Sequence, residues 1–179
     1  IIQSSPNRDG LTAACAAAAA AGAREAGAEV EDVRLNDLNV GLCAACNNGW
    51  GTCREEHYCQ VEDDFQALHA RVAAADALII VTPVYWGQPS ESAKAFLDRF
   101  RRCEATKREQ SALAGKPVLC VGAAGGSGGG TMTCLSELER WIGLVRATRW
   151  DLIPVTRWTR AYQLGTIREA ASALVSASS

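Results

Sequence analysis

The sequence predicts an α/β fold in which helices cover both faces of a five-stranded parallel sheet. Apolar runs typical of strands buried on both faces alternate along the chain with segments of helical periodicity. Glycine and proline residues separate these segments, as expected for the turns between them. Because alternating strands and helices form right-handed βαβ units, we expect the strands to lie in the order 2-1-3-4-5.

The first half of the chain carries the signals for three strands and two helices. An alanine-rich segment favours a helix, and Gly27 is placed to end it. The acidic pair Asp63 and Asp64 suits the start of the second helix, because carboxylates are favourable at the positive end of the helix dipole. The expected strands are residues 1–2, 29–35 and 77–81, and the expected helices are residues 12–25 and the segment that begins at residue 63.

The second half of the chain continues the alternation. Ser90 is a suitable N-cap for a helix whose buried face includes Phe96 and Phe100. Residues 82–89 and the glycine-rich residues 123–130 are expected to form loops. The expected strands are residues 118–122 and 151–155, and the expected helices begin at residue 90, follow residue 130 and close the chain at residues 166–175.

The composition indicates one globular domain that spans residues 1–179. The net charge of -2 offers little attraction for nucleic acid or an anionic membrane, and no apolar run approaches the ~20 residues that span a bilayer. Eight cysteines in a chain that can build its own core favour reduced thiols and a cytoplasmic location. No signal peptide is evident, but the sequence starts at Ile1 without a methionine, so we expect a few residues to precede it, and a short targeting segment stays open.

Three loops of unusual sequence follow strands one, three and four, so they should meet at the carboxyl edge of the sheet. The first loop, residues 4–12, leads into a helix N-terminus, where free amide groups and the helix dipole attract anions. Ser5, Asn7 and Thr12 can add side-chain donors, and Gly10 allows a close approach of the backbone. The loop lacks the Walker and GxGxxG patterns. An ordinary strand-to-helix turn is the alternative.

The second and third loops favour a flat ligand. Tyr85 and Trp86 stand in the second loop, where exposed aromatic surface is costly unless a planar ring or a neighbouring subunit covers it. The third loop, residues 122–130, is so rich in glycine that its backbone is expected to approach another group closely. A flexible connector is the alternative for this loop.

These stretches together resemble the NAD(P)H-dependent FMN reductases and iron–sulfur flavoproteins of the flavodoxin-like superfamily. The resemblance implies a flavodoxin-like three-layer α/β/α sandwich that binds FMN. It implies that the phosphate is held at Ser5, Asn7, Gly10, Leu11 and Thr12, and that the flavin ring is lined by Pro83, Val84, Tyr85, Trp86, Gly87, Ala124, Gly125 and Gly126. The matching stretches are residues 4–12, 43–46, 61–65, 82–87 and 94–99.

The resemblance also implies an activity. Hydride from NAD(P)H would pass to the flavin and then, in a ping-pong cycle, to a small acceptor such as a quinone or free flavin. No side chain is then needed as a catalytic acid or base. An electron carrier without NAD(P)H activity is the alternative. Members of this group usually form homodimers or homotetramers, and Trp141, Trp150 and Trp158 could serve such contacts or the core.

A separate cluster of cysteines lies in the long polar segment of residues 36–61. Its spacing is C-x2-C-x6-C-x5-C, from Cys43 through Cys46 and Cys53 to Cys59. The related iron–sulfur flavoproteins use a compact C-x2-C-x2-C motif and a fourth cysteine, whereas Gly49 occupies the third compact position here. We therefore expect no metal in this loop. A [4Fe–4S] cluster on the four thiolates, a zinc ion and a redox disulfide stay open as alternatives.

Overall fold

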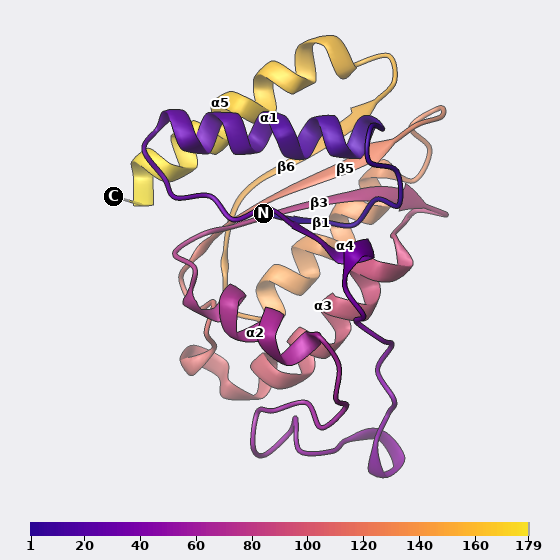
Figure 1. The fold of residues 1–179 in the computed structure, drawn as a ribbon, viewed down its shortest axis with the longest axis vertical. Helices are drawn as coiled ribbons and strands as arrows, with labels where there is room; N and C mark the ends of the chain where they lie inside the picture. The colour runs from indigo at the N-terminus through magenta and orange to yellow at the C-terminus, as the bar shows by residue number, and fades with distance from the viewer. Residues whose placement is uncertain (179) are drawn as a thin grey trace.

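A parallel sheet lies at the centre of the molecule with helices on both sides (Figure 1). The computed structural model describes residues 1–178. Its strands are β1 (Ile2–Gln3), β2 (Val33–Arg34), β3 (Leu78–Tyr85), β4 (Gln88–Pro89), β5 (Pro117–Ala124) and β6 (Thr148–Thr156). The order β2-β1-β3-β5-β6 confirms the predicted 2-1-3-4-5 arrangement, because β4 forms an antiparallel hairpin with β3 and adds no strand to the parallel series.

Two helices cover one face of the sheet and three cover the other (Figure 1). Ile79 and Val81 of β3 join the core on one side, whereas Leu78 and Ile80 join the core on the other. This alternation within a continuous apolar run is the pattern of a strand buried on both faces. The helices are α1 (Leu11–Glu25) and α5 (Arg160–Ser178) on the first face, and α2 (Phe65–Ala74), α3 (Glu91–Glu104) and α4 (Thr131–Leu144) on the second.

Several element boundaries differ from the sequence prediction: β5 includes residues 123–124, which were expected to form a loop, and β6 begins at Thr148 and not at residue 151, because the two strands pair along these residues. Residues 82–85, expected to form a loop, continue β3, because Val84 and Tyr85 pair with β4. Helix α5 begins at Arg160, six residues before the predicted start at residue 166. Strand β2 is shorter than the predicted 29–35, since β1 pairs with it through two residues alone. Each difference depends on pairing or packing with another segment, which the local periodicity of the sequence cannot reveal.

The alanine-rich sequence of α1 has a packing reason. Ala16, Ala19 and Ala23 are buried in the core beneath this helix. Gly22 faces α5, and a Cβ atom placed on it would lie 1.9 Å from the carbonyl oxygen of Arg168. Small residues therefore let the backbones of α1 and α5 approach each other closely.

Glu104, the last residue of α3, is a fully buried carboxylate with three partners. Its oxygens lie 2.8 Å from His69 Nε2 and 2.8 Å from Lys107 Nζ, and they accept a hydrogen bond of 2.7 Å from the amide of Ala112. Burial by itself raises the pKa of this carboxyl, but the hydrogen bonds from His69, Lys107 and Ala112 outweigh it and lower the pKa from 4.5 to about 2.

We expect this lowered pKa to make the folded state sensitive to acid. The carboxyl binds its proton more weakly in the folded chain than in the unfolded chain. Its contribution to the free energy of unfolding, about 3 kcal/mol, is therefore complete above about pH 4.5 and is lost as the pH falls toward 2. Urea unfolding at a series of pH values would measure it. The Glu104→Gln variant should be less stable at pH 7 and should lose much of the pH dependence in this range; an unchanged slope would contradict the assignment.

Candidate functional site

The loop of residues 4–12 joins β1 to α1 and offers free donors around an exposed turn, residues 6–9, with buried residues at its two ends. The amides of Ser5 and of residues 8–13 donate to no group of residues 1–178. Ser5 and Thr12 are themselves buried, and the Thr12 hydroxyl has no hydrogen-bond partner in the same part of the chain. Unpaired amides at a helix N-terminus attract an anion. The loop therefore fits the phosphate group of a nucleotide cofactor.

Hydroxyl groups from β3 and α3 hold the start of this loop. The Ser4 hydroxyl donates to Thr82 Oγ1 at 2.9 Å. The hydroxyls of Ser90 and Ser92 donate to the Ser4 carbonyl at 3.0 and 3.3 Å. Ser90 also accepts from the amide of Ala93, which confirms it as the N-cap of α3. Ser4, Thr82 and Ser92 could not be assigned from the sequence, because their contacts join segments that are 78 and 88 residues apart.

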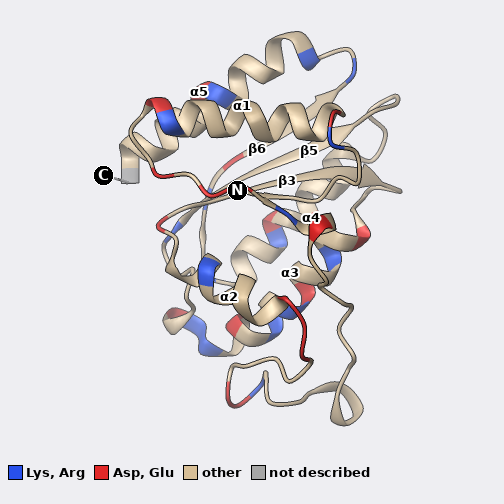
Figure 2. Cartoon of the chain, viewed as in Figure 1, with Lys and Arg blue, Asp and Glu red and all other residues tan. Residues whose placement is uncertain are grey.

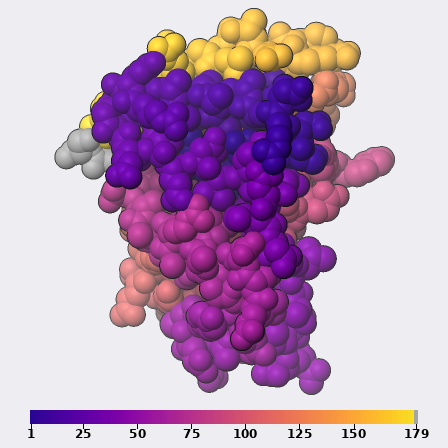
Figure 3. Space-filling model, in the orientation of Figure 1, coloured from indigo at the N-terminus to yellow at the C-terminus, as the bar shows by residue number. Residues whose placement is uncertain are grey.

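The aromatic loop is the tip of the β3–β4 hairpin, which protrudes from the molecule (Figures 1 and 3). Trp86 has a φ of 51° and Gly87 a φ of 76°, the left-handed pair that a two-residue hairpin turn requires. Trp86 is fully exposed, and Tyr85 is 38% exposed. The strand pairing thus fixes two aromatic side chains at the carboxyl edge of the sheet, where a planar ring can cover them.

The glycine-rich loop lies directly against this hairpin. A Cβ atom on Gly130 would lie 2.6 Å from Gly87 Cα, so the two backbones touch because neither residue has a side chain. Gly128 is similarly close to Thr156 at the end of β6. Gly125 and Gly126 have open space around them. Few charged residues lie at these loop tips, at the right of Figure 2.

The structure therefore brings the three loops to one edge of the sheet. Hydrogen bonds to Thr82 join the first loop to the end of β3, and the Gly87–Gly130 contact joins the second loop to the third. All predicted site residues lie on these loops or at the element ends beside them: Ser5, Asn7, Gly10, Leu11 and Thr12 on the first, residues 83–87 on the hairpin, and residues 124–126 at the end of β5 and just beyond. Their contacts with a cofactor remain predictions.

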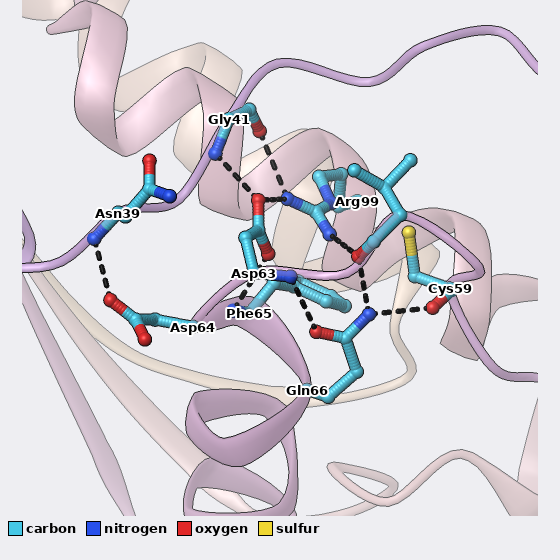
Figure 4. Close-up of polar contacts among 9 residues, drawn as sticks. Asn39, Gly41, Cys59, Asp63, Asp64, Phe65, Gln66 and Arg99 are labelled. Carbon is cyan, nitrogen blue, oxygen red and sulfur yellow. Dashed lines mark hydrogen bonds and ion pairs between the residues drawn. The ribbon is translucent and has the colours of Figure 1, made fainter.

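The cysteine-bearing segment forms a lobe below α2 and α3 (Figures 1 and 3). Its two ends are held together by a buried ion pair between Arg99 of α3 and Asp63 (Figure 4). Arg99 donates to the carbonyl of Gly41 at 3.1 Å and to that of Val61 at 3.0 Å, and Asp63 accepts from the Gly41 amide at 2.9 Å. Burial raises the pKa of Asp63, but the Arg99 guanidinium and the backbone amides of Gly41 and Phe65 bring it below its usual value.

The four cysteines of this lobe line one small pocket together with Arg99 and Arg102. All four are free thiols, and the pocket volume of about 20 Å³ holds about one water molecule. Within the described chain, no three His, Cys, Asp or Glu side chains converge as a metal-binding set. In this arrangement the four thiols do not form a ligand set, and the lobe would have to open before a [4Fe–4S] cluster could bind them.

The remaining cysteines and tryptophans divide between core and surface. Cys15, Cys103, Cys120 and Cys134 are buried, consistent with the expected role as small apolar residues. Trp141 is a core residue whose indole donates to the carbonyl of Leu97 at 2.9 Å, and Trp150 is partly buried. Trp158 follows β6 and is 60% exposed.

Comparison with known proteins places this geometry in context. Residues 1–148 match the family model described as NADPH-dependent FMN reductase. The iron–sulfur flavoprotein of Methanosarcina thermophila is 29% identical over 120 residues, which cover 67% of this chain and 59% of that protein. The chain thus spans about three fifths of the length of this relative.

Two solved structures show the same fold at low identity. The NAD(P)H:quinone oxidoreductase of Methanothermobacter marburgensis has a TM-score of 0.74 and 18% identity, covering 97% of this chain and 93% of that one. The flavodoxin of Megasphaera elsdenii has a TM-score of 0.57 and 22% identity, covering 97% and 99%. These matches confirm the predicted flavodoxin-like sandwich. None of the helices in residues 1–178 has the length and apolar character needed to cross a membrane.

Proposed function

Because the chain belongs to the NADPH-dependent FMN reductase family, we propose that it binds FMN and catalyses the oxidation of NAD(P)H with a small electron acceptor. The observation that carries the proposal is the meeting of three loops at one sheet edge: an anchor with unpaired amides, an exposed aromatic hairpin and a glycine loop in contact with it. Bound FMN would supply a ring that accepts hydride and returns electrons to a second substrate.

The residues of the chain would bind and orient this cofactor. The amides and hydroxyls of Ser5, Asn7, Gly10, Leu11 and Thr12 would hold the phosphate. Residues 83–87 and 124–126 would line the flavin ring, with backbone amide groups at its edge. The proposed acceptor is a quinone, a free flavin or a similar small planar molecule, which would occupy the same ring face as the nicotinamide in turn.

Absorbance spectroscopy gives the direct test. We expect the purified protein to bind FMN at micromolar concentrations with a perturbed flavin spectrum, and anaerobic NADH or NADPH to bleach that spectrum within the mixing time of a manual assay. The same concentration of FMN without protein is the control. Failure to bind FMN, or bleaching no faster than in the control, would contradict the proposal.

A second candidate function is electron transfer without NAD(P)H activity, through FMN and a cysteine-bound cluster. The observation that favours it is the gathering of Cys43, Cys46, Cys53 and Cys59 around one pocket. Iron, sulfide and zinc analysis of anaerobically purified protein decides it. About four irons and four sulfides per chain would support a [4Fe–4S] cluster; a metal-free protein that oxidises NAD(P)H would eliminate this candidate.

We also propose that the protein works as a homodimer or homotetramer in the cytoplasm. Trp86, Trp158 and Tyr162 are large exposed aromatic residues, which are common at protein interfaces. The free state of all eight cysteines supports a reducing compartment. Light scattering during size-exclusion chromatography measures the assembly.

A further inference from the structure

Arg34, at the end of β2, extends its guanidinium to the loop that joins β1 to α1. Its Nη2 donates to the carbonyl of Ser5 at 3.2 Å, and its Nη1 donates to Gln3 Oε1 at 3.3 Å. The side chain is 17% exposed, and its Nε is buried without a hydrogen-bond partner in residues 1–178. A positively charged group is therefore held at the base of this loop.

The position of this guanidinium is fixed from several sides. The Gln3 side chain is buried and donates to the two carboxylate oxygens of Asp32 at 2.8 and 3.0 Å. Asp37 Oδ2 lies 3.4 Å from Arg34 Nε, and the same carboxylate binds the exposed Arg8 at 2.7 Å. The neighbouring cation Arg8 is 73% exposed and, among the described residues, paired with Asp37 alone, whereas Arg34 is tied to β1 and to the loop itself.

The bond from Arg34 decides which groups of the loop are presented outward. The Ser4 carbonyl is bonded by Ser90 and Ser92, and since the N–H of a trans peptide points opposite to its C=O, the Ser5 amide is directed away from α3. The next carbonyl, that of Ser5, is bonded by Arg34. Without that bond, its partly negative oxygen could turn toward a bound anion. With it, the two consecutive carbonyls are both occupied by protein donors.

We propose that Arg34 is a positioning residue for the phosphate group of FMN, which holds the Ser5 carbonyl away from the anion and adds fixed positive charge beneath the loop. This inference rests on the proposed function. A phosphate monoester carries about −1.5 to −2 charges near pH 7. The affinity for FMN should therefore respond both to the orientation of the Ser5 carbonyl and to the charge of Arg34. Riboflavin has the same ring without the phosphate, so its affinity should not respond.

The test compares FMN with riboflavin in binding titrations of three variants and the wild type. We expect Arg34→Met to weaken FMN binding about tenfold or more, because it removes hydrogen bonds from a charged group. The same variant should weaken riboflavin binding less than threefold. Arg34→Lys keeps the charge but lacks the rigid planar fork that reaches Gln3 and Ser5 at once, so it should lose an intermediate part of the FMN preference. The matched control is Arg71→Met on α2, which removes the same charge and an exposed ion pair with Glu31.

Each outcome has a defined meaning. Equal weakening of FMN and riboflavin by Arg34→Met would show a merely structural role and overturn the inference, as would an unchanged FMN preference in that variant. If Arg34→Met does not fold, Arg34→Lys decides, because an unchanged preference there would show that the forked guanidinium contact to Gln3 and Ser5 is not needed and would overturn the inference. If the wild type binds no FMN, the proposed function itself fails, which is a different result. Arg71→Met should leave both affinities unchanged.

Discussion

Replacing Arg99 by methionine is expected to lower the free energy of unfolding by about 3–5 kcal/mol, because it leaves the buried carboxylate of Asp63 without its cation. The guanidinium lies 2.5 Å from Asp63 and also occupies the carbonyls of Gly41 and Val61, so three acceptors lose a donor at once. The cysteine lobe should then open at its base. Urea unfolding measures the stability, and limited proteolysis between residues 42 and 60 measures the opening.

Two variants make this experiment specific. Arg140→Met removes an exposed arginine that pairs with Glu137 on the surface of α4, and it should change the stability little. The double variant Asp63→Asn with Arg99→Met removes the unpaired charge, so it should be more stable than Arg99→Met alone. If Arg99→Met unfolds at the same urea concentration as Arg140→Met, the ion pair does not hold the lobe.

Replacing Gly130 by alanine is expected to weaken FMN binding by about ten- to a hundredfold, because relief of about 1–3 kcal/mol of backbone strain would move the loop that is proposed to line the flavin. The new Cβ would lie 2.6 Å from Gly87 Cα and 2.9 Å from Gly87 N, so the hairpin and the glycine loop must move apart. Gly130 also has a φ of 83°, a conformation that alanine adopts only with strain. Flavin fluorescence titration measures the affinity.

Gly129→Ala is the matched control for this prediction. Gly129 is the preceding residue of the same loop, and the nearest atom to its added Cβ is the Ser127 hydroxyl at 3.5 Å, an ordinary contact. Its φ lies outside the left-handed range. Gly129→Ala should therefore bind FMN nearly as the wild type does. Similar affinities for both variants would show that the contact between hairpin and loop does not shape the site.

Much of the site could be predicted because it lies where local signals are strong. The turn residues Pro6 and Gly10 end the first strand, and the glycine run after β5 indicates that its backbone approaches another group closely. Parallel topology then places both loops at one edge without any knowledge of side-chain contacts. The comparison with known families confirms the fold, and the positions of the loops follow from it.

Other features depended on contacts between distant segments. The hairpin after residue 82 forms because Val84 pairs with Pro89, although the apolar run by itself indicates a strand that ends at residue 81. No local pattern in the sequence predicts that the side chains of Arg34 and Arg99 are buried. The structure buries the side chain of Arg99 and most of that of Arg34, because carbonyl groups and a carboxylate from other segments surround them.

The sequence by itself determined the alternation of strands and helices, the sheet order and the edge at which the three loops meet. These follow from hydrophobic periodicity and chain connectivity, which are local properties. Only the tertiary structure decided which polar groups are paired beneath the first loop, how the cysteine lobe is closed and that Gly87 touches Gly130. Such pairings depend on the distances between segments that are far apart in the chain, and no local pattern of residue types encodes those distances.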